Sequence, residues 1–236
     1  MLKVHEKINH FSYTSGMDCL EDCFNKKHFN NYKKQISYQY NSYGFRDEEW
    51  PTDLSDVIWC VGDSFTVGIG QPYNETWPKV LERKIRKRCL NLGEDGCSND
   101  TITQRVQEIY KLYKPQLIII MWSYFNRRNI HGKNVHSDKN DFGLDKDLDN
   151  FVKNFKIVNS LPVDVINLVI PNASSFDNKA HLVYFLKKNR IENLLIFDQL
   201  DYARDYHHFD IKTSECISNL ILGKIKDLDI ESKYIL

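Results

Sequence analysis

The sequence has no long hydrophobic run, and it contains little glycine or proline. Its longest strongly apolar stretch, Leu117–Trp122, is far too short to cross a bilayer. The first residues, MLKVHEKINHFSYTSG, lack the uninterrupted apolar core of a secretory signal. We therefore expect a soluble, cytoplasmic protein with no membrane partner. Ten glycines and six prolines in 236 residues also argue against a low-complexity or disordered chain.

An excess of charge is also missing. Lys and Arg total 32, and Asp and Glu total 32, so the formal net charge is zero. This balance gives no broad attraction to polyanions, and we expect no nucleic-acid partner. The six cysteines are scattered without paired zinc-type spacing, and His131, His136 and His181 lack metal-ligand spacing. We expect reduced, structural cysteines and no metal.

What the sequence does contain is enough apolar residues for one sizeable core. The hydrophobic fraction is 42%, and aromatic residues make up 13%. Residues 1–55 are polar and lack a clear period, whereas strand-like and helix-like segments alternate from residue 56 onward. We therefore predict an N-terminal extension, 1–55, packed on a single domain, 56–236.

Two local features are expected within the extension. A short helix is predicted over Asp18–Phe24, and a turn with an aromatic anchor over Asn41–Arg46. The extension also holds several aromatic residues that could stack on a sugar, although packing against the core is the favoured interpretation. These are Tyr38, Tyr40, Tyr43 and Phe45.

The domain shows alternating strand and helix signals. Short apolar runs predict strands at 57–61, 89–92, 116–122, 163–170 and 194–197. Amphipathic periodicity predicts helices at 77–87, 101–113, 148–160, 180–189 and 213–226. Residues 127–147 are polar and are expected to form a long loop or lid. Arg127 and Arg128 could be solvated there or form an anion-binding lip, and the solvated interpretation is favoured. The alternation predicts an α/β fold with a parallel sheet between two helical layers.

One predicted strand ends beside a residue whose side chain could react. Val57–Val61 leads directly into Gly-Asp-Ser, which places Ser64 at the carboxyl end of a parallel strand, where α/β proteins form their sites. A serine hydroxyl needs a base and a group that orients the base. Asp205 and His208, three residues apart near the C-terminus, supply both from one short segment, with His207 as an alternative base. Asp63 is expected to bond across the turn.

Nucleophilic attack on a carbonyl also needs hydrogen-bond donors for the developing oxyanion. The backbone N–H groups of Ser64 and Gly96 are candidates, since glycine permits close approach of the backbone to a substrate. The side-chain amide of Asn126, after the strongest strand, is a third candidate.

These segments resemble the conserved blocks of the SGNH (GDSL-type) hydrolases. Gly62–Thr66 resembles the first block, Asn91–Ser98 the second, and Asp205-x-x-His208 the last. The resemblance runs from about residue 57 to residue 225. It implies a flavodoxin-like, three-layer α/β/α fold in which Ser64 is the nucleophile and Gly96 the oxyanion-hole glycine. The family contains esterases, lipases, carbohydrate deacetylases and some acyltransferases, and it needs no metal or organic cofactor.

The third block departs from the family pattern. The family usually has Gly-x-Asn-Asp, whereas this chain has Ser123-Tyr-Phe-Asn126 followed by two arginines. Asn126 matches the family's asparagine only with a one-residue slip. Ser123 or Arg127 could supply the donor instead.

The resemblance implies a serine esterase or deacylase. Its substrate would be a short acyl ester or an acylated sugar, such as an O-acetyl group on carbohydrate. Two alternatives remain open: an acyltransferase that passes the acyl group to or from a polysaccharide, and a non-catalytic binding domain. The sequence does not predict an oligomeric state.

Overall fold

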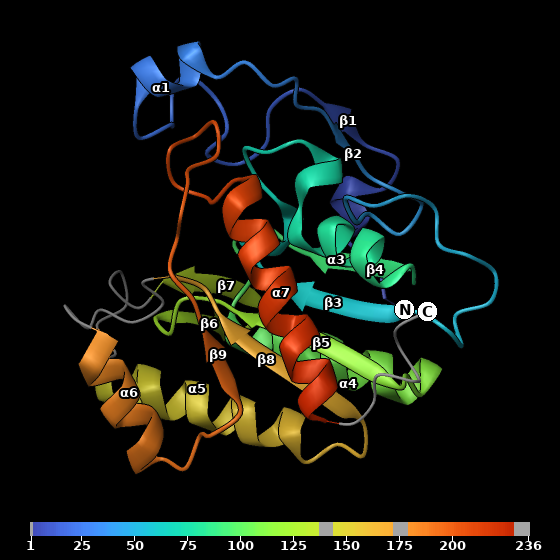
Figure 1. Cartoon of the computed structure of the whole chain (residues 1–236), viewed down its shortest axis with the longest axis vertical. Helices are drawn as coiled ribbons and strands as arrows, with labels where there is room; N and C mark the ends of the chain where they lie inside the picture. Colours follow the sequence, from blue (N-terminus) through green and yellow to red (C-terminus); the bar gives the residue numbers. More distant parts are fainter. Residues whose placement is uncertain (1, 137–143, 172–178, 229–236) are drawn as a thin grey trace.

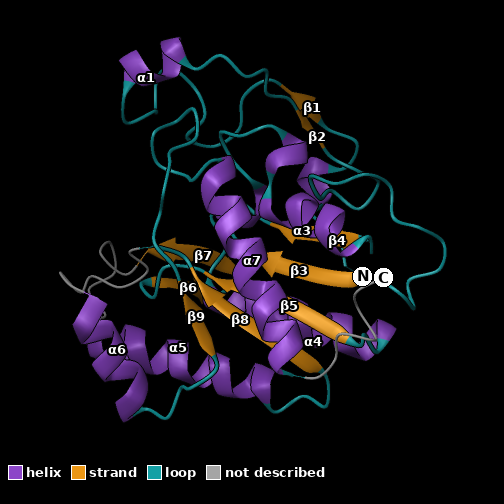
Figure 2. Ribbon diagram, viewed as in Figure 1, coloured by secondary structure: helices purple, strands orange, loops and turns teal. Residues whose placement is uncertain are grey.

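The computed structural model describes residues 2–136, 144–171 and 179–228, and its centre is a parallel sheet of five strands (Figures 1 and 2). The strands follow the spatial order β4-β3-β5-β8-β9, and every neighbouring pair is parallel. Their bounds are Ile58–Gly62 (β3), Cys89–Gly93 (β4), Leu117–Trp122 (β5), Asp164–Val169 (β8) and Leu194–Ile196 (β9). This order is flavodoxin-like, as expected.

The three inner strands β3, β5 and β8 form the core of the sheet. All residues of β3 and β5 are buried, because helices cover both faces of the sheet. The register aligns Gly62 with Gly93 on one side and with Met121 on the other, so three strand ends meet beside residue 63. The sheet thereby gathers the segments that follow β3, β4 and β5 at one edge.

Helices complete the other two layers. The helix α3 packs with α7, which crosses in front of the sheet in Figure 1, and α4 packs with α5. The helices of the domain are α2 (Ser64–Val67), α3 (Trp77–Ile85), α4 (Asn99–Tyr113), α5 (Leu144–Asn159), α6 (Lys179–Lys188) and α7 (Ile211–Asp227), with a 3-10 turn η2 (Tyr73–Glu75). The predicted three-layer α/β/α fold is confirmed. Within the described ranges, no helix is both long and apolar enough to cross a membrane.

The segment after β5 corrects the expectation of a long loop over 127–147. It begins with a hairpin of β6 (Arg127–Ile130) and β7 (Lys133–His136), and α5 starts at Leu144. His131 and Gly132 form the two-residue turn, both with positive φ. Such a turn matches the twist of paired strands, which explains how a polar segment forms a hairpin.

The N-terminal extension contains η1 (His5–Lys7), β1 (Phe11–Ser12), α1 (Lys26–Asn31) and β2 (Tyr38–Gln39). The short helix expected over Asp18–Phe24 is wrong: the helix begins at Lys26, because the Asn25 side chain caps it by accepting from His28 N–H. The expected turn at Asn41–Arg46 is present, with Gly44 at φ +83° and Phe45 fully buried.

The four aromatic residues singled out in the extension pack against other side chains. Tyr38, Tyr40 and Phe45 are buried, and Tyr43 stacks on Trp50 with ring centroids 4.2 Å apart. Tyr38 and Phe45, which are fully buried, therefore offer no free face to a sugar. Their packing agrees with the favoured sequence interpretation.

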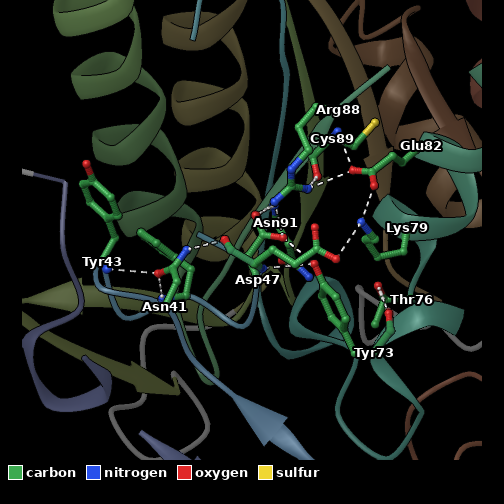
Figure 3. Close-up of polar contacts among 12 residues, drawn as sticks. Asn41, Tyr43, Asp47, Tyr73, Thr76, Lys79, Glu82, Arg88, Cys89 and Asn91 are labelled. Carbon is green, nitrogen blue, oxygen red and sulfur yellow. Dashed lines mark hydrogen bonds and ion pairs between the residues drawn. The ribbon is translucent and has the colours of Figure 1, made fainter. Parts of the chain in front are cut away.

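Asp47 joins the extension to the sheet (Figure 3). Its buried carboxylate accepts hydrogen bonds from the Tyr73 hydroxyl and from the backbone N–H of Asn91 in β4, and it forms an ion pair with Arg88 at 2.8 Å. Burial raises the pKa of the Asp47 carboxyl, against the opposing effect of Arg88. The network fixes the extension to the strand that leads into the second sequence block.

Candidate active site

Ser64 lies at the point where β3 gives way to the short helix α2. Asp63 is the N-cap of that helix and accepts a hydrogen bond from the N–H of Phe65 at 3.1 Å. Gly62 must be glycine here, because a Cβ atom would lie 2.1 Å from Thr66 Oγ1. The cap and the close packing turn the chain sharply, so that the Ser64 hydroxyl lies beyond the end of the sheet.

The structure brings Ser64, His208 and Asp205 into one hydrogen-bonded chain. His208 Nε2 lies 2.8 Å from Ser64 Oγ, and His208 Nδ1 lies 2.5 Å from Asp205 Oδ2. All three residues are buried, with exposed fractions of 2%, 3% and 0%. This is the arrangement in which a histidine can take a proton from a serine while a carboxylate fixes its tautomer.

Asp205 is suited to remain ionised. Burial alone would raise the pKa of its carboxyl, but the charge and ring N–H of His208 and the N–H groups of His207 and His208 outweigh it. Together they hold the pKa below its usual value. The carboxylate can therefore support a positive charge on His208.

His207, the alternative base, does not approach Ser64 in the same way. Its Nε2 lies 3.3 Å from the Tyr124 hydroxyl, and its ring packs against Phe24 and Phe65. Burial, followed by the like charge of His208, lowers the pKa of His207 to about 4. The described contacts therefore favour His208 as the partner of Ser64.

Gly96 lies in the loop that follows β4. This loop runs beside the nucleophile turn, because Glu94 N–H donates to Gly62 O at 3.0 Å and the Cys97 thiol donates to the same oxygen. Gly96 has a φ of +71°, and a Cβ placed on it would meet nothing within 4 Å. Among the described residues, no acceptor takes the backbone N–H of Gly96 or of Ser64. Both groups therefore remain candidate donors to a ligand.

Arg127 contradicts the expectation of a solvated arginine. Its side chain is 11% exposed, and its guanidinium donates to Asp63 Oδ2 at 2.9 Å, while Ser123 Oγ donates to the same carboxylate oxygen at 2.6 Å. The buried Asp63 carboxylate needs such partners. Arg128 is also paired, with Asp147 of α5 at 2.8 Å. The expected role of Asp63 across the turn is confirmed by its cap bond.

Asn126 lies in the turn between β5 and β6, which is closed by a bond from Arg127 N–H to Tyr124 O. Its side chain is half-buried, and its role as a third donor stays a prediction. The neighbouring Ser123 is held by Asn99, whose amide contacts the backbone of Ser123 and Tyr124. The sequence analysis did not single out Asn99, because its contacts join segments that are 24 residues apart in the chain.

A metal site is not evident in the described ranges, where no three His, Cys, Asp or Glu side chains gather as ligands. His136 lies in β7 and His181 in α6, and the structure describes only the backbone of these two residues.

Comparison with known proteins identifies the fold. A scan against protein-family models finds no match, and a search of curated proteins finds none either. Solved structures do match. The psychrotrophic esterase EstA from Pseudoalteromonas sp., inhibited by monoethylphosphonate, has a TM-score of 0.51 and 17% identity, covering 74% of this chain and 98% of its own.

Two further structures are similar. TesA matches with a TM-score of 0.52 and 13% identity, covering 73% of this chain and 99% of its own. A family two carbohydrate esterase with a carbohydrate-binding domain, from Corynascus thermopiles (Myceliophthora fergusii), matches with a TM-score of 0.50 and 14% identity. That match covers 80% of this chain and 70% of the esterase. At these identities the likeness concerns the fold, and the chain has the three-layer α/β/α fold of the SGNH hydrolases.

Proposed function

We propose that the protein is a serine esterase that hydrolyses a short acyl ester. The observation that carries this proposal is the continuous chain from Ser64 Oγ through His208 to Asp205. A buried serine hydroxyl needs a hydrogen-bond partner for folding, but that partner need not be a histidine that is itself paired with a buried carboxylate. The match to structures of esterases supports the same reaction class.

In the proposed mechanism, His208 Nε2 takes the proton of Ser64 as Oγ attacks the ester carbonyl. The carbonyl oxygen becomes an oxyanion that the N–H groups of Ser64 and Gly96 bind, with the Asn126 amide as a third donor. His208 then protonates the departing alcohol, and the acyl group stays on Ser64. Water, deprotonated by His208, attacks the acyl-serine and releases the acid.

We propose an acylated carbohydrate, such as an O-acetylated sugar, as the substrate class to examine first. The similar carbohydrate esterase supports this choice. Acetyl, butyryl and longer p-nitrophenyl esters, assayed beside acetylated sugars, will define the acyl length and the alcohol. Adding a sugar acceptor and analysing the products separates hydrolysis from acyl transfer.

The test is Ser64→Ala. We expect turnover of p-nitrophenyl acetate to fall by about 10⁴-fold or more, because the members of such a triad act as a unit. Labelling by a fluorophosphonate probe should disappear, while the circular dichroism spectrum and the melting temperature stay close to those of the wild type. Unchanged turnover in this variant, or a wild-type protein that the probe does not label, would overturn the proposal.

A further inference from the structure

The segment 201–210, called the catalytic loop here, carries both Asp205 and His208. It is folded tightly on itself: Ala203 N–H donates to His208 O at 2.8 Å, and Tyr206 has a φ of +61°. It also touches the nucleophile side of the site, since Arg204 N–H donates to Gly70 O at 2.8 Å. The position of the catalytic loop relative to Ser64 therefore also depends on the contacts that the loop makes with the rest of the protein on its outer side, which faces away from Ser64.

The outer side is held by Asp18 of the N-terminal extension. Arg204 Nε donates to Asp18 Oδ1 and Arg204 Nη2 donates to Asp18 Oδ2, both at 2.7 Å. A two-point contact between a planar guanidinium and a carboxylate fixes orientation as well as distance. Asp18 is fully buried, although it lies in the polar N-terminal extension. Arg204 directly precedes Asp205.

A second series of hydrogen bonds, through Tyr38 and Gly70, connects Asp18 to the site. The Tyr38 hydroxyl donates to Asp18 Oδ2 at 2.6 Å and accepts a hydrogen bond from Gly70 N–H at 2.8 Å. Gly70 lies against the loop so closely that a Cβ on it would be 3.1 Å from Asp205 Oδ1. Burial raises the pKa of the Tyr38 hydroxyl, which keeps it protonated as a donor.

Two more contacts from the extension reach the same loop. Phe24 N–H donates to Asp205 O at 3.0 Å, and His28 Nε2 lies 2.9 Å from Ala203 O. In Figure 1 the loop ahead of α7 accordingly runs next to the segment that carries α1. The extension thus contacts the catalytic loop on both sides of Arg204.

We infer that Asp18 is a positioning residue, which holds the Asp205–His208 pair in register with Ser64 through Arg204 and Tyr38. The inference rests on the proposed function. Asp18 does not touch the reacting atoms. Its effect comes from fixing the loop, because small displacements of a catalytic base cost large factors in rate.

The test is Asp18→Asn in the full chain, compared with Asp147→Asn. Asp147 is also a buried carboxylate paired with an arginine, but its partner is Arg128 and it lies on α5. Both variants should lower the melting temperature. Only Asp18→Asn should lower kcat for p-nitrophenyl acetate, by about 10- to 100-fold with KM within about twofold, and slow fluorophosphonate labelling of Ser64 to a similar extent.

If Asp18→Asn does not fold, the milder variant Tyr38→Phe tests the positioning role of Asp18. It removes only the hydroxyl between Asp18 and Gly70, and it should reduce kcat by about threefold to tenfold, with little effect on KM. The inference is overturned if kcat and the labelling rate in Asp18→Asn equal those of Asp147→Asn, or if a folded Tyr38→Phe retains wild-type kcat. Full activity in Ser64→Ala would instead overturn the proposed function, so the two failures are distinguishable.

Discussion

At the scale of single residues, Gly96 shows how a backbone requirement and a chemical one coincide. The left-handed φ of +71° favours glycine, a Cβ atom placed there would meet nothing within 4 Å, and the backbone N–H is a proposed oxyanion donor. Gly132, in the hairpin turn, has the first two of these properties with a φ of +82°, yet no chemical role is proposed for it. A comparison of Gly96 with Gly132 therefore separates the effect of backbone strain from an effect on catalysis.

We predict that Gly96→Ala and Gly132→Ala each destabilise the protein by about 1–2 kcal/mol, the cost of an alanine at positive φ. Only Gly96→Ala should also lower kcat/KM, by about 10²-fold, because the new methyl disturbs a proposed oxyanion donor. Urea unfolding and p-nitrophenyl acetate kinetics on both variants measure the two effects. Equal kcat/KM in the two variants would argue against an oxyanion role for Gly96.

The pairing of Asp63 with Ser123 and Arg127 is the residue-scale feature that sequence reasoning could not derive. Asp63 and Arg127 are separated by 64 residues, and nothing in a polar Arg-Arg dipeptide indicates that one arginine is buried. The contact exists because the ends of β3 and β5 adjoin in the sheet. By contrast, the cap role of Asp63 is local and was predictable.

At the scale of elements, the packing of His207 in the catalytic loop makes the stability of the protein depend on pH. His207 is held neutral with a pKa of about 4, below the value of about 6.5 that it has in an unfolded chain. The unfolded chain therefore takes up the proton first as the pH falls. The lowered pKa of His207 means that its neutral ring stabilises the folded protein. This contribution to the free energy of unfolding is complete above about pH 6.5 and is lost between about pH 6.5 and 4.

We predict that the free energy of unfolding falls more steeply over this range in the wild type than in His207→Gln. The difference should reach about 2 kcal/mol at pH 4, since the ring is only partly shielded from solvent. Asp205 acts lower on the scale: its depressed pKa gives stability above about pH 3.9 that is lost on further acidification. Urea titrations at half-unit pH steps provide the measurement, and parallel curves for the two proteins would contradict this assignment.

Elements differed in how well the sequence predicted them. The strands β3 and β5 are contiguous apolar runs buried on both faces, so composition alone located them. The hairpin β6–β7 was missed because its residues are polar and its strands pair only with each other. The helix α1 was misplaced because it buries none of its residues and thus shows no apolar period.

At the scale of the whole molecule, the extension and the domain share their apolar packing. Leu2, Phe45 and Trp50 belong to the main core, where Trp50 meets Trp59 of β3 edge-to-face. A second cluster joins Ile36, Tyr38 and Tyr40 of the extension to Val67 and Ile69, at the end of the helix α2 that begins with Ser64. The sequence predicted that the extension packs on the domain, but not that it reaches the catalytic loop.

This shared packing predicts a single cooperative unfolding transition. Urea curves followed by tryptophan fluorescence and by far-ultraviolet circular dichroism should superimpose, because the four tryptophans include one in the extension and three in the domain. Two separate midpoints would show that the extension unfolds on its own.

The ion pair between Asp18 and Arg204 joins residues 186 positions apart in the chain. During synthesis, the extension leaves the ribosome long before its partners on the catalytic loop exist. Tyr38 can already pack on Val67 and Ile69, but the buried carboxylate of Asp18 lacks Arg204 until the segment before α7 has emerged. Ser64 likewise meets Asp205 and His208 only then, so the proposed chemical centre is assembled after the catalytic loop has been synthesised.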